Sequence, residues 1–326
     1  MTTAAFAVMA AWASLAHATC TFNAAGLTVT PLTASTGTYT TPTAPVAQAV
    51  SITLTGTYNT NATAGTCNGA ISFQRTSLPA TMAKTSGGAA TLPYTIRTAA
   101  GGGNVLLFSG NSVSYANIQQ FSFTSAGANL TNRAYSVNLT TYFLMQPGAP
   151  QAAGSYSNGL TMWIFDLATG SGYASRGFTV TGTVAKVCTI GGVAQPTADT
   201  ATIPVTPAGA VNTTVINKSY ASAVCNTPSN VQMTSLNGAV KTAASPPSGF
   251  TNVINYSSTA VFSGASASLN TATNPLAIGP EAGTAVSTTG TLPTGTLTVT
   301  ITPQANGLRL LSGSYADTLT ITITPQ

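Results

Sequence analysis

The chain has 326 residues, enough for about two domains. Charged residues make up 4% of it, nine Lys or Arg and four Asp or Glu with a formal net charge of +5, whereas an ordinary globular chain has about 25%. Hydrophobic residues make up 44%, which excludes disorder through lack of apolar content. The single histidine, His17, lies in a segment expected to be removed, and this excludes most acid–base, triad and metal chemistry.

The first eighteen residues have the features of a secretory signal. Residues 4–15 form a short apolar run, and Ala16-His17-Ala18 follows as a cleavage pattern. The run is too short to span a bilayer, so we expect a signal peptide over 1–18 and a mature chain that begins at Thr19. An apolar N-terminal strand is the alternative, and the lack of Lys or Arg before the run allows a start further upstream. No later segment is long and apolar enough to predict a membrane span.

Four cysteines, an even number, indicate disulfides in an exported chain. Cys20 and Cys67 are 47 residues apart, Cys188 and Cys225 are 37 apart, and a gap of 121 separates the two pairs. This spacing favours the bridges Cys20–Cys67 and Cys188–Cys225, one in each half. The sequence has no CxxC motif and no histidine after His17, so we expect neither a metal nor a cofactor.

Alternation of apolar and small polar residues predicts strands along most of the chain. Val50, Ile52 and Leu54 alternate with Ser and Thr, and so do apolar residues near 297–301 and 319–323. Clusters of Gly, Pro and Asn interrupt these runs, and no stretch has helical periodicity with caps. The fold class is therefore expected to be all-β. The basic residues are scattered rather than clustered, which argues against nucleic-acid binding.

The two halves of the chain are copies of one plan. Gly154–Phe165 and Gly313–Thr324 are identical at six of twelve positions with an offset of 159, and Cys67 and Cys225 are offset by 158. We therefore expect an N-terminal domain over 19–187 and a C-terminal domain over 188–326. Each is predicted to be an immunoglobulin-like β-sandwich, and the two lie in tandem in the sequence.

One segment differs between the copies. After a predicted loop at Asp166–Ser175, the first half continues with an alternating strand at Arg176–Lys186, and the second half ends at Gln326 without a counterpart. The first sandwich is therefore expected to be complete, and the second to lack its last strand, which another chain must supply by donor-strand complementation. The residues expected to fill the first groove from the same chain are Phe178, Val180, Gly182 and Val184, and those expected to line the open groove are Leu319, Ile321 and Ile323.

At this point the residues resemble a known family, the spore coat protein U domain, which is the pilin fold of archaic (Csu-type) chaperone–usher pili. The resemblance lies in Gly313, Tyr315 and Asp317 before an alternating strand, and in Leu92–Tyr94. The first copy has Gly154 and Tyr156 but Asn158 in place of Asp. The resemblance also implies that each cysteine pair joins the first strand of a domain to the end of its second.

The family implies export through the periplasm to the cell surface. Its partners would be a periplasmic chaperone, an outer-membrane usher and an adjacent pilin subunit that donates a strand. Cleavage after Ala18 would leave only Thr19 before Cys20, so this subunit would accept a strand and have none to donate. That favours the tip of a pilus, with adhesion and biofilm formation through the N-terminal domain. A non-adhesive coat or shaft subunit is the alternative, and the scattered carboxylates argue against a carbohydrate-active enzyme.

An adhesive surface is predicted at the pole of the first sandwich that carries the loops Asp166–Ser175, Asn59–Gly69 and a hairpin near Ala99–Phe108. Apolar side chains there would bind an apolar or host surface. The alternatives are that Val105–Phe108 is a core strand, and that a rival patch at Tyr142–Met145 forms the surface instead. The candidate residues are Val105, Leu106, Leu107, Phe108, Leu144, Met145, Leu167 and Tyr173.

Overall fold

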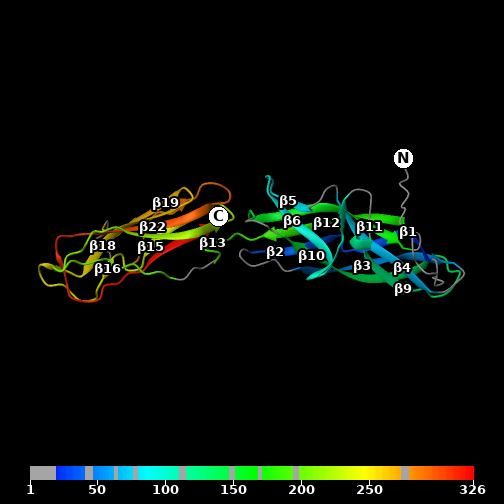
Figure 1. Ribbon diagram of the computed structural model, residues 1–326, viewed down its shortest axis with the longest axis horizontal. Helices are drawn as coiled ribbons and strands as arrows, with labels where there is room; N and C mark the ends of the chain where they lie inside the picture. Colours follow the sequence, from blue (N-terminus) through cyan, green and yellow to red (C-terminus); the bar gives the residue numbers. More distant parts are fainter. Residues whose placement is uncertain are drawn as a thin grey trace. The chain divides into compact units, whose positions relative to one another are not determined.

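The computed structural model describes residues 20–40, 47–61, 65–75, 80–109, 115–146, 151–167, 171–193, 198–272 and 279–326 (Figure 1). The predicted signal peptide at 1–18 lies outside them. The chain divides into two compact units: unit 1 ends at Val184, and unit 2 contains the described residues from Ala185 to Gln326. In the described part of the chain, no helix is long and apolar enough to cross a membrane.

Unit 1 is built from long alternating strands with shorter ones between them, as expected for half-buried antiparallel sheets. Its elements are β1 (Cys20–Thr30), β2 (Thr33–Tyr39), β3 (Gln48–Thr60), β4 (Thr66–Arg75), β5 (Thr81–Lys84), β6 (Thr91–Ala99), β7 (Gly102–Val105), β8 (Leu107–Ser109), the 3-10 helix η1 (Tyr115–Asn117), β9 (Gln119–Thr124), β10 (Arg133–Met145), β11 (Gly154–Asp166) and β12 (Ser171–Val184). The strands are paired in the order β1-β3-β10-β6-β5-β11-β12-β2, and β4 adds to β11 with β8 and β9 beside it.

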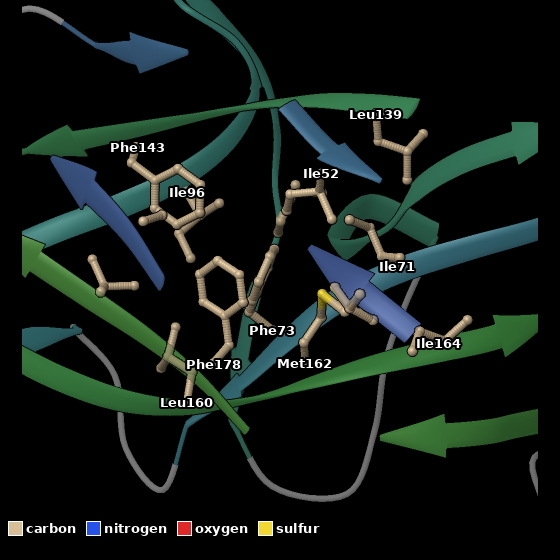
Figure 2. Close-up of a cluster of buried hydrophobic side chains, with 14 of the residues drawn as sticks. Ile52, Ile71, Phe73, Ile96, Leu139, Phe143, Leu160, Met162, Ile164 and Phe178 are labelled. Atoms are coloured by element: carbon tan, nitrogen blue, oxygen red, sulfur yellow. The ribbon is translucent and has the colours of Figure 1, made fainter. Parts of the chain in front are cut away.

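The core of unit 1 lies between two layers of strands (Figure 2). One layer includes β3 and β10, and the other includes β4, β11 and β12. Phe73 of β4 meets Phe143 of β10 with ring centroids 6.0 Å apart, and it meets Phe178 of β12 at 5.1 Å. Ile52 and Met162 are fully buried beside them. Because β12 contributes a ring to this centre, it is an integral part of the core.

Unit 2 repeats the plan with shorter strands. Its elements are β13 (Cys188–Ile190), β14 (Ile216–Cys225), β15 (Ser229–Ser235), β16 (Val240–Lys241), β17 (Phe250–Thr251), β18 (Val253–Phe262), β19 (Ala265–Asn270), β20 (Glu281–Ala282), β21 (Val286–Ser287), β22 (Thr294–Gln304), β23 (Arg309–Leu310) and β24 (Leu319–Pro325). One sheet has the order β13-β14-β22-β18-β16, and another has β15 between β24 and the short strands β20 and β21. The all-β fold class predicted from alternation is confirmed.

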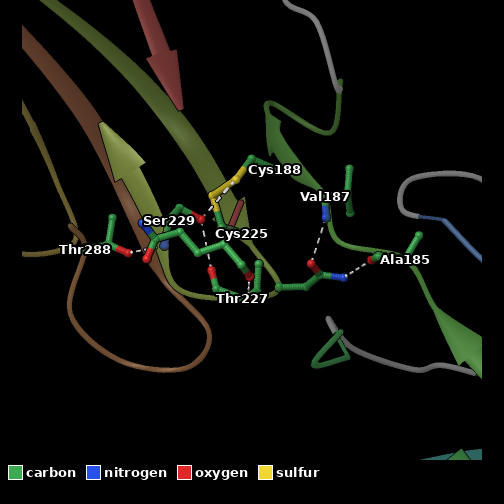
Figure 3. Close-up of a disulfide and its surroundings, with 9 residues drawn as sticks. Ala185, Val187, Cys188, Cys225, Thr227, Ser229 and Thr288 are labelled. Carbon is green, nitrogen blue, oxygen red and sulfur yellow. Dashed lines mark hydrogen bonds between the residues drawn. A yellow bond between two sulfur atoms is a disulfide. The ribbon is translucent and has the colours of Figure 1, made fainter. Parts of the chain in front are cut away.

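Each unit contains one disulfide. Cys188–Cys225 joins β13 to the end of β14 (Figure 3). Ser229 lies beside this disulfide. Its hydroxyl donates a hydrogen bond to the carbonyl of Thr227, and its N–H donates one to Thr288 Oγ1. Cys20–Cys67 joins β1 to the start of β4, so the expectation that the second cysteine ends the second strand fails in unit 1. The reason is that β3 ends at Thr60, and the chain has already entered the next strand at Cys67.

Candidate functional site

Strand β12 fills unit 1 from within the same chain. It pairs antiparallel with β11 from Gly154↔Val184 to Asp166↔Ser171, and in parallel with β2 from Thr179↔Thr33 to Val184↔Tyr39. Phe178, Val180 and Val184 lie in the core with at most 2% of their surface exposed. The prediction of a loop over Asp166–Ser175 is wrong for residues 171–175. Strand β12 begins at Ser171 and is paired with β11 from that residue on.

Gly182 occupies the tightest point of β12. A Cβ placed there would lie 2.5 Å from Thr36 Oγ1, 2.9 Å from Met82 Cε and 3.3 Å from Met145 Sδ. Cβ contacts below 3.0 Å are essentially never seen, so a side chain at this position would require the side chains of Thr36 and Met82 to shift. The inward positions of β12 therefore pack closely into the core of unit 1: Phe178, Val180 and Val184 are buried there, and Gly182 lies between the two valines.

The strand of unit 2 that corresponds to β11 is β24, and it is less covered. Leu160, Met162 and Ile164 of β11 are almost fully buried. Their counterparts at the offset of 159 are Leu319, Ile321 and Ile323, which pack against the core of unit 2 but are only partly buried. The same sequence positions thus differ in burial between the copies, and in unit 1 the cover comes from β12.

The backbone of β24 shows the same difference. In the described residues β24 pairs only with β15, from Ser235↔Leu319 to Ser229↔Pro325, whereas β11 has strands on both edges. β24 has 7 residues and β11 has 13. The residues that correspond to the first half of β11, 313–318, contain only one isolated bridge, Lys241↔Ala316. The unpaired edge and the partly buried row beside it form an open strand edge, which we call the acceptor edge.

Asp317 fixes the chain where β24 begins. Its Oδ2 accepts hydrogen bonds from the hydroxyls of Ser235 and Tyr256, both at 2.6 Å, and its Oδ1 accepts one from the Asn237 N–H at 2.9 Å. Burial raises the pKa of Tyr256 above its ordinary value of 10.0, and the bond to Asp317 raises it further because both partners carry negative charge when ionised. The hydroxyl is therefore a fixed donor to the carboxylate.

The residues predicted for an apolar tip are mostly core. Leu106, Leu107, Phe108 and Met145 have at most 5% of their surface exposed, so they cannot present an adhesive patch, and the core-strand alternative for this segment is the correct one. Val105 and Tyr173 pack against the same core, and Leu167 packs against a small cluster around Phe165. Leu144 is partly exposed on the outer face of β10.

The predicted pole also lacks the hairpin assigned to it. Arg97 pairs with Tyr142 in the second half of β10, so the β6–β7 hairpin lies along the side of unit 1. The segment that sequence reasoning missed is 125–132, which forms hydrogen bonds with the end of β3 and with the loop after it. The Thr60 N–H donates to the Leu130 carbonyl at 2.9 Å, and the Ser125 N–H donates to the Gly65 carbonyl at 2.8 Å. Its Asn and Ser content was a turn signal, but no local pattern gave its position.

The described surface of unit 1 is polar at this pole. The Asn132 N–H donates to Asn59 Oδ1 at 2.7 Å, and Asn23 Nδ2 donates to Asn132 Oδ1 at 3.0 Å. Among the described residues of unit 1, the one large apolar side chain that is clearly exposed is Leu32. Across the described ranges, no group of three or more His, Cys, Asp or Glu could hold a metal ion.

Comparison with known proteins gives structural matches alone. No family model and no curated protein matches the sequence. A chain of the CsuC–CsuE chaperone–tip subunit pre-assembly complex from archaic chaperone–usher Csu pili of Acinetobacter baumannii aligns at 15% identity and a TM-score of 0.41, over 94% of this chain and 99% of that one. The CupB6 tip adhesin of Pseudomonas aeruginosa aligns at 13% and 0.29, over 94% of each chain. CfaE, the adhesive subunit of CFA/I fimbria of enterotoxigenic Escherichia coli, aligns at 13% and 0.29, over 89% and 92%.

Proposed function

We propose that this chain is a strand-accepting subunit at the tip of a chaperone–usher pilus. Unit 2 would join the fibre by taking an extended strand from the adjacent subunit, and unit 1 would present the adhesive surface and take part in biofilm formation. Before assembly, a periplasmic chaperone would cover the acceptor edge, and an outer-membrane usher would exchange that cover for the donor strand.

The observation that carries this proposal is the difference between β11 and β24. The two strands have equivalent sequences, yet β11 is paired on both edges and buried, whereas β24 has one paired edge and a partly exposed apolar row. Three apolar side chains brought from partial to full burial, together with a ladder of hydrogen bonds, would stabilise unit 2 by several kcal/mol, at roughly 25 cal/mol per Å² of apolar area. An edge of this kind favours a partner that adds a strand.

The tip position follows from the closed state of unit 1. Its last strand comes from its own chain, so unit 1 needs no donor, and the acceptor edge lies in unit 2. One closed unit and one open unit suit the end of a fibre. The adhesive role is assigned to unit 1 because unit 2 would be occupied by the fibre.

A peptide with the sequence of residues 176–186 tests strand acceptance. We expect it to bind the full chain and to slow amide exchange in β24. Ile321→Asp should weaken binding at least tenfold, because a carboxylate would be buried against the peptide. Thr320→Asp is the matched control, since Thr320 is exposed on the opposite face of the same strand.

Binding that is equally strong in the two variants, or a peptide that leaves exchange in β24 unchanged, would contradict strand acceptance. The adhesive role needs a separate measurement. Beads that carry the peptide would capture the chain through unit 2 and leave unit 1 free. We expect these beads to attach to polystyrene or to glycan-coated surfaces more than beads with peptide alone. Equal attachment on every surface would favour the non-adhesive structural subunit.

A further inference from the structure

The outer face of β11 carries a large side chain that lies outside the main core of unit 1. Met162 and Ile164 are buried in that core, so Trp163 between them points to the opposite face of the sheet. Trp163 is paired with Ser72 of β4 and with Ser175 of β12, and it therefore lies within the sheet rather than at its edge. Its side chain is only partly buried. A tryptophan in this place leaves part of a large apolar ring in contact with solvent.

The side of Trp163 that faces β4 is covered. Ser72 is fully buried, and its hydroxyl donates a hydrogen bond to the Asn117 carbonyl at 2.5 Å, so the end of η1 lies over this part of β4. The indole N–H donates to Gln74 Oε1 at 2.6 Å, which fixes the orientation of the ring. The ring also packs against a small buried cluster, which consists of Ala70, Ile118 and Phe165. Trp163 is therefore held in place before any ligand arrives.

The side of Trp163 that faces β12 is open. A Cβ placed at Gly159 or Gly177 would meet nothing within 4 Å, in contrast to Gly182 on the inner face of β12. Glycine weakens the interior of a strand, and it often marks a place where a ligand approaches the backbone closely. We call this surface the indole ledge, and it consists of Trp163 with the outward residues beside it on β11 and β12, which are Gly159, Thr161, Ser175, Gly177 and Thr179.

The indole ledge is uncharged. Its six residues are one tryptophan, two glycines, two threonines and one serine. Arg176 is next to Ser175 in the chain, but its guanidinium donates to the carbonyls of Ser175 and Leu27, both at 2.8 Å. A ligand of this surface would meet an apolar ring, bare backbone and hydroxyl groups. That combination matches a neutral molecule with an apolar face and a polar rim better than an ion.

We infer that the indole ledge binds a neutral glycan through one of its sugar rings. The C–H face of a hexose ring is apolar and would pack against the exposed part of the indole. The hydroxyls at the rim of the sugar would form hydrogen bonds with Thr161 and Ser175, and the absent side chain of Gly177 leaves room for the ring. The inference rests on the adhesive role proposed for unit 1 and gives that role a chemical class of ligand.

The test is a titration of the chain that begins at Thr19 with cellohexaose, an uncharged glucose oligomer. The sequence has two tryptophans, and Trp12 lies in the predicted signal peptide, so the emission of this chain comes from Trp163. We expect a saturable change in that emission. Gly177→Val places a branched side chain on the ledge and should weaken binding about tenfold or more, the effect of steric overlap. Thr183→Val is the matched control, because Thr183 is exposed at the other end of β12, opposite Ser155.

The outcomes separate this site from the adhesive role itself. A saturable change that only Gly177→Val weakens would support the inference. No change in Trp163 emission, or equal affinity in the two variants, would overturn it. An emission that varies with the concentration of the chain alone would overturn it too, because a second copy would then cover the ledge. Beads that carry the Gly177→Val chain and still attach fully to glycan-coated surfaces would exclude the ledge and leave the adhesive role in place.

Discussion

Asn158 and Asp317 occupy equivalent positions in the two copies and meet equivalent tyrosines with opposite hydrogen-bond roles. Asn158 Nδ2 donates to the Tyr94 hydroxyl at 2.7 Å, whereas Asp317 accepts from the Tyr256 hydroxyl. The amide lies in unit 1, where β11 is paired on both edges, and the carboxylate lies in unit 2, where β24 pairs only with β15 in the described residues. A carboxylate can accept several donors at once, which lets one residue hold β15 and the approach to β24 together.

Replacement of Asp317 tests this role. Asp317→Ala would leave the hydroxyls of Ser235 and Tyr256 buried without their acceptor, at a cost of about 2–4 kcal/mol in the free energy of unfolding of unit 2. The measurement is urea-dependent amide exchange in β15. Asp199→Ala removes an exposed acidic residue of the same unit and should leave that exchange nearly unchanged. A similar effect of both variants would contradict the assignment.

Alkaline pH should destabilise unit 2 through Tyr256. Its pKa is raised in the folded chain, so above the ordinary value of 10.0 the unfolded chain loses a proton that the folded chain retains. The contribution is complete below pH 10 and is lost as pH rises above it, by up to about 1.4 kcal/mol per pH unit. Tyr256→Phe should remove that part of the slope in unfolding measured from pH 9 to 12, and an unchanged slope in this variant would contradict it.

At the scale of elements, the sizes of the inward side chains of β12 match the space that the neighbouring strands leave for them. Of its inward residues, Phe178 has a large side chain, Val180 and Val184 have medium ones, and Gly182 has none. The absent side chain matches the approach of Met82 and Met145. Alternation in the sequence predicted the strand and its inward face, but the need for glycine came only from the packing of three other strands.

A valine at Gly182 should destabilise unit 1. Gly182→Val places atoms against Thr36, Met82 and Met145, and overpacking of this kind costs about 1–3 kcal/mol. Gly177→Ala is the matched control in the same strand, because a Cβ there meets nothing within 4 Å. Trp163 of β11 provides a fluorescence signal for urea unfolding. If both variants unfold at the same urea concentration, the fit at Gly182 is not a constraint.

The elements also show where prediction from sequence fails. Period-two alternation is local, so it identified the long strands and the core character of their alternate residues. The pole at which a loop lies depends on how many strands precede it. The short strands β5, β7 and β8 have too few residues to show alternation. The apolar residues 105–108 were therefore open to two interpretations, and only their burial decides between them.

The whole molecule should respond to a donor in one unit only. A peptide that binds folded unit 2 stabilises it by about 2.7 kcal/mol when its concentration is a hundredfold above its Kd. We expect the unfolding transition of unit 2 to move to higher urea while that of unit 1, followed by Trp163, stays in place. A shift of the Trp163 transition would mean that the peptide binds unit 1, whose site β12 already fills.

The internal repeat predicts the plan of the molecule from the sequence, because Gly154–Phe165 and Gly313–Thr324 are identical at six of twelve positions. The comparison of equivalent strands then supplied what neither copy shows alone. The partial burial of the apolar residues of β24 stands out because the equivalent residues of β11, Leu160, Met162 and Ile164, are almost fully buried in the same chain.

The connection from β12 into unit 2 has a mechanical consequence. Strand β12 ends at Val184 and unit 2 begins at Ala185, so tension between the two units is applied to β12 at its last residue. When the pull runs along the strand, the hydrogen bonds to β11 and β2 are loaded together in shear and cannot open one after another. Phe178 must also be drawn past its neighbours before the strand can slide. Shear loading of this kind would give the fold of unit 1 a long lifetime under force, because many hydrogen bonds and one buried ring must give way at once.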